Sequence, residues 1–137
     1  MKVKVNWEGK MRFEAVGDSV HTVVKDTPPS MGGEDQGPRP MEMVLMALGG
    51  CTGIDVVAIM NKQRAPIDRL EIEIDAERAA EEPRVFTSAV IKYHIWGSDV
   101  AEDKVRRAIE LTQEKYCSVL HMVNKTAKID YSYEIHR

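Results

Sequence analysis

Hydrophobic and polar residues alternate with a period of two in three short segments at the start of the chain. The segments are residues 2–7, 11–16 and 20–25, and short Gly-containing turn sequences separate them. Alternation of this kind indicates strands with one buried face, and short turns favour antiparallel neighbours. We therefore predict a three-stranded antiparallel meander. Residues 27–38 are dense in Pro and Gly and have no period, so we predict a loop there.

The run from Met41 to Met60 is the most hydrophobic part of the chain, interrupted only by two carboxylates, one threonine and three glycines. A helix of this composition is apolar around most of its circumference and is typical of a buried core helix. We expect it to begin near Pro40, which suits a first helical turn, and to end near Gln63, ahead of Pro66. The two carboxylates and the lack of a basic N-terminal flank argue against a membrane span.

Two further strands, an amphipathic helix and a last strand are predicted in the second half of the chain. Residues 70–77 alternate strictly, and residues 85–96 have the pattern of a longer strand. Between residues 101 and 116 apolar side chains recur at helical spacing, and residues 126–135 return to alternation. This mixture of strands and helices predicts an α+β fold.

Length and composition narrow the class of protein. A chain of 137 residues fits one domain, which we place at residues 1–137. The net charge is −3 and the sequence pI is about 5.8, with no basic block, so nucleic acid is not an expected partner. The first residues lack the apolar core of a signal peptide, which favours a cytoplasmic location.

Cys51 and Cys117 are the only cysteines. Disulfides in a reducing compartment are usually transient and form during catalysis or redox sensing, so we interpret the two cysteines as candidate reactive residues. A thiolate attacks a peroxide, and the sulfenic acid that forms condenses with a second thiol. Two other interpretations remain open at this point. Both thiols can be inert, since free cysteine is often simply buried, or they can bind a metal together with His121.

The segment Gly37-Pro38-Arg39-Pro40 through Gly49-Gly50-Cys51, together with Cys117-Ser118-Val119, resembles the OsmC/Ohr family of thiol peroxidases. The likeness covers nearly the whole chain, because the predicted order of strands and helices also matches that family. The resemblance implies an intertwined homodimer with two antiparallel sheets around central helices. It also implies reduction of organic hydroperoxides, with Cys51 as the peroxidatic residue, Cys117 as the resolving residue, and no metal or other cofactor. A small thiol or a lipoylated protein would be the reductant.

Three further residues are candidates for supporting roles by the same resemblance. In the family a glutamate at the start of the helix holds a catalytic arginine, and here the nearest carboxylate is Glu42, one residue later than expected. Glu42 can equally serve the helix dipole. Arg12 and Arg39 are the candidate arginines, and either can instead be a solvated surface residue. Asp55 lies one helical turn after Cys51, where its negative charge opposes thiolate formation.

The remaining candidates have ordinary alternatives. His121 can assist proton transfer at Cys117 or simply pack, and no role is assigned to His21, His94 or His136. Several methionines and two phenylalanines can line a pocket for an alkyl peroxide or belong to the core; they are Met41, Met43, Met46, Met60, Met122, Phe13 and Phe86. If Asp55 suppresses the thiolate, the alternative function is a redox-sensing or hydrophobic-ligand-binding protein with little turnover.

Overall fold

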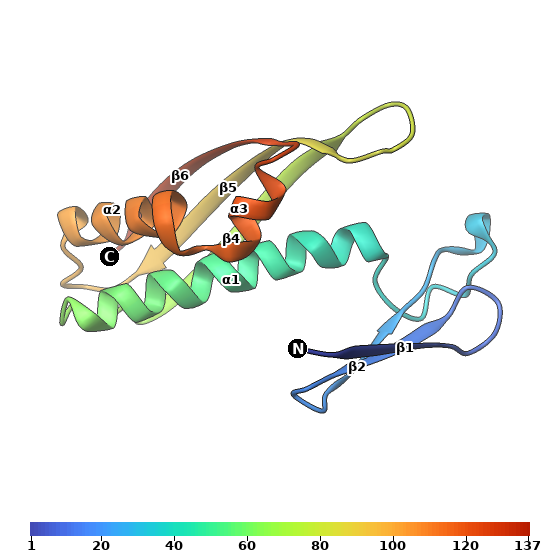
Figure 1. Ribbon diagram of the computed structural model, residues 1–137. Helices are drawn as coiled ribbons and strands as arrows, with labels where there is room; N and C mark the ends of the chain where they lie inside the picture. The colour runs from blue at the N-terminus through green and yellow to red at the C-terminus, as the bar shows by residue number, and fades with distance from the viewer. The chain divides into compact units, whose positions relative to one another are not determined.

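The computed structural model describes residues 1–137 and divides the chain into two compact units, Met1–Met46 and Ala47–Arg137 (Figure 1). The first unit contains three strands, one turn of 3₁₀ helix and the beginning of the long helix α1. The second contains the rest of α1, three more strands and the shorter helices. The prediction of a single domain over residues 1–137 stays a prediction. The elements of the first unit are β1 (Val3–Trp7), β2 (Phe13–Gly17), β3 (Thr22–Lys25) and η1 (Pro29–Met31).

The first sheet is an antiparallel meander in the order β1-β2-β3, as the alternation predicts. Its register pairs Val5 with Ala15 and Ala15 with Val23, which lines apolar side chains across one face. That face is open to solvent in the single chain, where Val5 is 49% exposed and Trp7 66%. Exposed apolar patches of this kind are typical of surfaces that contact another molecule.

The loop after β3 is organised around the buried carboxylate of Asp26. Its oxygens accept hydrogen bonds from the backbone N–H groups of Thr27, Glu34 and Gln36, at 2.7, 3.3 and 3.1 Å. These hydrogen bonds, with that from Thr27 the strongest, lower the pKa of Asp26 against the opposing effect of burial. One side chain thus fixes a loop that has no regular structure for most of its length.

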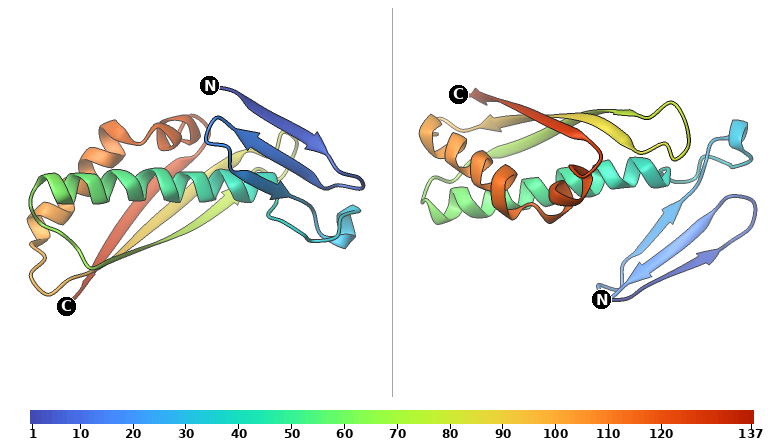
Figure 2. Two further views of the ribbon diagram at one scale, coloured as in Figure 1. Left: turned by 90° about the horizontal axis from the view of Figure 1, so that it is seen from below. Right: turned by 45° about the horizontal axis from the view of Figure 1, so that its top comes forward.

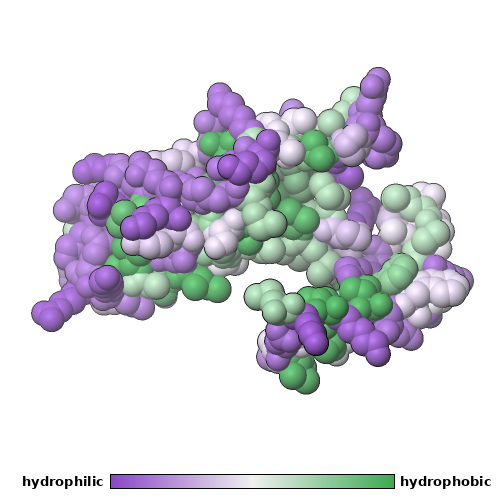
Figure 3. All heavy atoms as spheres, in the orientation of Figure 1, coloured by the Kyte–Doolittle hydropathy of each residue, from purple (hydrophilic) through white to green (hydrophobic).

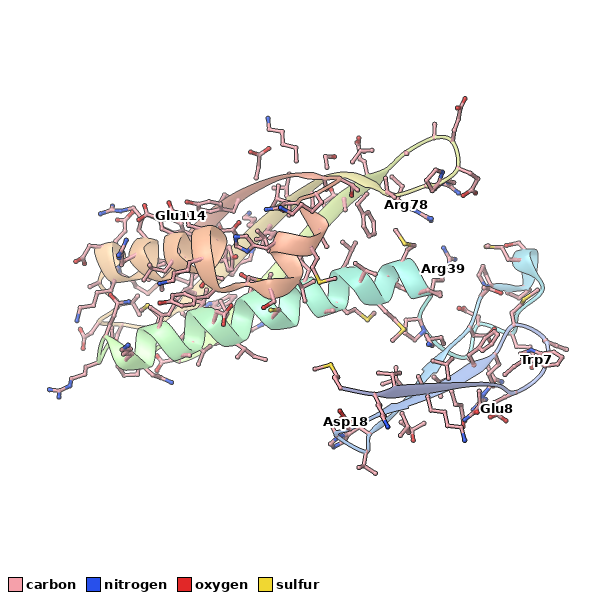
Figure 4. The ribbon with its side chains drawn as sticks, in the orientation of Figure 1. Trp7, Glu8, Asp18, Arg39, Arg78 and Glu114 are labelled. Atoms are coloured by element: carbon pink, nitrogen blue, oxygen red, sulfur yellow. The ribbon has the colours of Figure 1, made fainter.

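Helix α1 (Pro40–Lys62) begins and ends where the sequence predicts. Pro40 occupies the first helical position, and Arg39 lies just ahead of it, at the N-terminal end of α1 (Figure 4). The carboxylate of Glu42 accepts the backbone N–H of Arg39 at 2.9 Å, which is one half of a capping box. Glu42 therefore has a structural role at the helix start.

The second sheet has the order β4-β5-β6 and is formed by β4 (Arg69–Arg78), β5 (Phe86–Trp96) and β6 (Lys128–His136). Strands β4 and β5 are antiparallel, but β5 and β6 are parallel. The expectation of two antiparallel sheets is therefore wrong for the second one. The reason is the connection: a helical crossover carries the chain back to the starting end of β5 before β6 begins, and that geometry gives a parallel pair.

The crossover consists of α2 (Glu102–Leu111), the π-helical turn η2 (Thr112–Tyr116) and α3 (Ser118–Val123). The single helix predicted for residues 101–116 is thus only partly regular α-helix, because its last five residues widen into a π-turn and Cys117 then adopts an extended conformation. The crossover helices and α1 lie on the same face of the second sheet (Figure 2). The other face of the sheet carries no helix.

Burial of α1 is narrower than its composition suggests. Leu48, Thr52, Val56 and Met60, each four residues apart, form one buried stripe. Ile54 remains 71% exposed and Met46 55%, and apolar residues are visible on the molecular surface (Figure 3). The expectation of a fully buried helix is therefore wrong for the single chain. By length and hydropathy α1 alone is able to span a membrane, but its buried stripe packs on its own sheet, as in a core helix.

Candidate active site

Cys51 and Cys117 meet on the inner side of the second unit. Cys51 lies in the middle of α1 and is half-buried, whereas Cys117 is fully buried between η2 and α3. Both sulfur atoms and a carboxylate oxygen of Asp55 lie within 4.8 Å of one another. The chain thus brings together two thiols that are 66 residues apart in sequence. A disulfide requires a further approach of the two sulfur atoms, to about 2.05 Å.

Burial dominates the properties of the Cys117 thiol. Its sulfur accepts the backbone N–H of Leu120 at 3.4 Å, which makes Cys117 the cap of α3 and favours the thiolate. Desolvation is the larger effect and, with the hydrogen bond and charge of Cys51 and the charge of Asp55, raises the pKa of Cys117 to about 12. Cys117 is therefore a protonated thiol at neutral pH.

Asp55 shares the site with both cysteines, as its position one turn after Cys51 predicts. Burial raises its pKa, and its Oδ2 atom is buried without a hydrogen-bond partner. An orphaned buried carboxyl oxygen is unusual in a folded protein and marks a strained or functional position. The charge of ionised Asp55 is one of the effects that raise the pKa of Cys117.

A buried hydrogen-bond chain fixes the segments that carry the two cysteines. The hydroxyl of Tyr93 on β5 lies 2.6 Å from the Thr52 hydroxyl and accepts the side-chain N–H of Gln113 at 2.8 Å. Thr52 is the neighbour of Cys51, and Gln113 lies in the π-turn that ends at Cys117. Both Thr52 and Tyr93 are inaccessible to solvent. No pattern in the sequence marks this network, because its members are ordinary core positions until the fold joins them.

Two of the three glycines of α1 let the helix approach β4 closely. A Cβ atom on Gly53 would lie 3.1 Å from the end of Ile72, and one on Gly49 3.4 Å from the end of Ile74. Gly50 has no neighbour within 4 Å of that position and lines an open groove of about 600 Å³ with Gly53, Ile54 and Val57. Gly49 and Gly53 thus let the part of α1 that carries Cys51 pack closely on β4, and Gly50 lies on the exposed side of the helix.

A second cleft, of about 510 Å³, is lined by Asp55 and adjoins the first groove at Ala58. Its lining combines the apolar residues Ile59 and Leu111 with Lys62, Arg107 and Tyr116. Of the three residues that meet at the thiols, Asp55 alone lines this cleft. The proposed methionine lining is not found there: Met60 and Phe86 are buried in the core, and Met122 is 73% exposed.

The candidate supporting residues belong to the first unit and have partners of their own. The Arg12 guanidinium donates to Gln36 at 2.6 Å and to Glu14 at 2.9 Å. Glu42 caps α1 through the backbone of Arg39, whose side chain forms no salt bridge. Of the two arginines, Arg39 is therefore the one with an uncommitted guanidinium.

His121 does not face either thiol. Its Nδ1 lies 2.8 Å from the carbonyl oxygen of Cys117 and its Nε2 3.1 Å from that of Glu114. It holds the π-turn to α3 and is a packed helix histidine. A metal bound at the thiols would have Cys51, Asp55 and Cys117 as ligands in place of the cysteine and histidine set considered from the sequence.

Comparisons with known proteins identify the family and the fold. A family model described as OsmC-like protein matches residues 33–132. Protein YhfA of Escherichia coli strain K12 is 39% identical over 135 residues, which are 98% of each chain. The crystal structure of a hypothetical protein from Aquifex aeolicus VF5 has a TM-score of 0.86 at 29% identity, covering 98% of this chain and 95% of that one.

The organic hydroperoxide resistance protein OhrB of Bacillus subtilis has a TM-score of 0.68 at 15% identity, with 98% of both chains covered, and this likeness is one of fold alone. These findings confirm the expected OsmC-like α+β fold. Family model, sequence relative and solved structures all extend over the elements that carry the paired cysteines, and the chain therefore belongs to the family of OsmC-like proteins.

Proposed function

We propose that this protein is a thiol-dependent peroxidase that reduces organic hydroperoxides through Cys51 and Cys117. The observation that carries the proposal is the approach of the two sulfur atoms to within 4.8 Å from distant parts of the chain. A role as small buried hydrophobic residues does not explain why the two cysteines lie together beside an unpaired carboxyl group. The name of OhrB, a structural relative, points to the same chemistry.

The chemistry needs no cofactor. The Cys51 thiolate attacks the distal oxygen of R–O–O–H, the O–O bond breaks, and the alcohol leaves with one proton. Cys51 is then a sulfenic acid, which condenses with the Cys117 thiol to give a disulfide and one water. The hydroperoxide gains two electrons, and the two thiols lose them. A small dithiol or a lipoylated protein restores both thiols by exchange.

The different environments of the two cysteines support this division of roles. Cys51 is half-buried and reachable, while Cys117 is fully buried with a pKa raised to about 12. Only a thiolate attacks peroxide efficiently, so Cys117 is a poor first nucleophile. It is well placed as the second thiol, because it already lies beside the sulfur that becomes oxidised. Arg39 and Arg12 remain the candidates for stabilising the Cys51 thiolate, with Arg39 favoured by its uncommitted side chain.

Thiol titration after one equivalent of cumene hydroperoxide tests the proposal. We expect loss of both thiols per chain and an intrachain Cys51–Cys117 bridge by mass spectrometry. Cys51→Ser should abolish turnover, and Cys117→Ser should consume one equivalent of peroxide and stop at sulfenic acid. Unchanged thiols in the native chain would refute the peroxidase, and equal residual turnover in the two variants would refute the assigned roles.

The second candidate is a redox-sensing or ligand-binding protein with little turnover, favoured by the Asp55 carboxyl group beside both thiols. A steady-state assay with cumene hydroperoxide and dithiothreitol separates the two functions. Sustained turnover supports the enzyme. Rapid labelling of Cys51 without turnover supports the sensor, and slow labelling of both thiols opposes both functions.

The proposal includes an intertwined homodimer located in the cytoplasm. The single chain leaves two apolar faces uncovered, one along Ile54 and Val57 of α1 and one on the first sheet around Val5 and Trp7. Burying surfaces of this kind drives association. Sedimentation of the native protein should give a dimer. Ile54→Asp should shift it toward monomer, and Val20→Asp, at an exposed turn, should not.

A further inference from the structure

We propose that the helix-free face of the second sheet carries a binding site for a divalent transition metal ion of the zinc class, with His94, Glu134 and His136 as its ligands. This site is separate from the thiols, which lie on the face covered by helices, and it does not depend on the peroxidase proposal. The sequence assigns neither histidine a role, since no catalytic partner is visible near either one, and 42 residues separate the two.

The parallel pairing of β5 and β6 creates the cluster. The register sets His94 beside Glu134 and Trp96 beside His136. Tyr93 and Ile95, which alternate with these residues on β5, are buried against the helices. The intervening side chains therefore project together from the opposite face. An antiparallel β6 would have given a different set of neighbours, so the cluster is a direct product of the crossover.

Three ligand-type atoms already lie at the separations that a metal requires. His94 Nδ1 is 3.1 Å from His136 Nε2 and 3.5 Å from Glu134 Oε2, and His136 Nε2 is 3.8 Å from the same oxygen. A point equidistant from these three atoms lies about 2.0 Å from each, which matches the bond lengths of zinc to imidazole nitrogen and carboxylate oxygen. The ion can enter with little movement of the side chains.

Each ligand is also held by a second group, as in established metal sites. His94 uses its other nitrogen, Nε2, in a 2.9 Å hydrogen bond to Glu73, which leaves Nδ1 turned toward the cluster. A carboxylate on the far nitrogen of a ligating histidine is the usual arrangement around zinc. The second oxygen of Glu134 lies 3.3 Å from the Lys92 ammonium. The His136 ring stacks on Trp96 at 4.5 Å, and Arg69 covers that indole at 4.4 Å.

The donor set selects the class of metal. Two imidazoles and one carboxylate suit zinc, copper or nickel, whereas magnesium and calcium prefer oxygen ligands throughout. The side chain of His94 is 13% exposed and that of His136 36%, so the ion is reached from solvent. Three protein ligands leave a fourth tetrahedral position open, which water fills or a partner's side chain takes.

Calorimetric titration of the full chain with zinc chloride tests the site. The parent carries Cys51→Ser and Cys117→Ser so that the thiols do not contribute, and we expect one zinc per chain. His94→Gln or His136→Gln should weaken binding at least 100-fold. Glu73→Gln, which removes only the carboxylate behind His94, should weaken it about 10- to 100-fold. His21→Gln is the matched control, because His21 is an exposed imidazole in the first unit.

Two readouts separate a ligand role from a merely structural one. Cobalt in place of zinc should give the intense visible absorption of a four-coordinate ion in the parent and in His21→Gln, and lose it in His136→Gln. Far-UV circular dichroism of the metal-free variants should match the parent. Absence of zinc binding by the parent, or equal affinity in the parent and both histidine variants, would overturn the proposal. Loss of binding in His21→Gln as large as that in His94→Gln would also overturn it.

Discussion

Replacement of Thr52 by valine is the most direct test of the network that positions the cysteines. Valine keeps the shape of the side chain but removes the hydroxyl that lies 2.6 Å from Tyr93. Tyr93 then retains only Gln113 as a partner, in a region that solvent does not reach. Loss of one buried hydrogen bond with a partner left behind costs about 1–2 kcal/mol of the free energy of unfolding.

Tyr93→Phe removes the central hydroxyl and leaves both neighbours without it, so we expect a loss of about 1–3 kcal/mol. The double variant should lose less than the sum of the two single variants, by about 0.5–1.5 kcal/mol, because the shared hydrogen bond is lost only once. For a chain of this length, 1 kcal/mol corresponds to a decrease in Tm of about 3–4 °C.

Urea titrations of the reduced proteins, all at the same protein concentration, measure these differences in the free energy of unfolding. Thr22→Val is the control, since Thr22 is an exposed strand residue whose hydroxyl forms no hydrogen bond, and its replacement should change stability by less than about 0.5 kcal/mol. The rate of disulfide formation after peroxide should also fall in Thr52→Val, because Thr52 neighbours Cys51. A stability of Thr52→Val within about 0.3 kcal/mol of the native value, or strict additivity in the double variant, would refute the reasoning.

Three further predictions follow from single side chains. Asp55→Asn should stabilise the protein at neutral pH. Because the pKa of Asp55 is raised in the folded state, the native protein loses stability as pH rises from about 3.9, the ordinary pKa, through the raised value. Urea unfolding should therefore show a difference in free energy of unfolding between the two proteins that grows with pH over this range. A difference that does not change with pH would contradict this. Glu42→Ala should destabilise the start of α1 by about 0.5–2 kcal/mol through loss of its cap on Arg39, measured by thermal unfolding with the exposed Glu114→Ala as comparison. Val20 has a positive φ of 61°, which a β-branched residue adopts at a cost of about 1–2 kcal/mol. Val20→Asn should therefore raise the Tm, and a lower Tm would argue against strain at this turn.

The regular elements follow from local patterns. Period-two alternation predicts the meander and β4, and the Pro40 start and polar end of α1 are predicted to within a residue. Strand direction is a different matter, because alternation is the same in parallel and antiparallel strands. The helical crossover between β5 and β6 is the feature of the sequence that indicates a parallel pair. The π-turn escapes prediction because its residues keep the spacing of an ordinary helix.

The candidate site is only partly predictable. Asp55 is predictable beside Cys51 because the two residues are one turn apart on the same helix. Spacing alone does not predict that Cys117 lies near them. The resemblance to the OsmC/Ohr family supplies the expectation that the two cysteines meet. The partial exposure of α1 is not predictable from its apolar composition, because composition does not say how many sides of a helix the same chain covers. Tyr93 and Gln113 join the site through tertiary contacts that no local pattern encodes.

The position of β6 has a consequence for biosynthesis. Strand β5 forms the centre of its sheet, yet one of its two edges is satisfied only by the last nine-residue strand, Lys128–His136. During translation β6 leaves the ribosome more than 30 residues after β5, so the nascent chain holds an unpaired edge of β5 until β6 emerges. A chain truncated before residue 128 would have an open strand edge at Ile91, Tyr93 and Ile95, a template for aggregation that pairing with β6 covers.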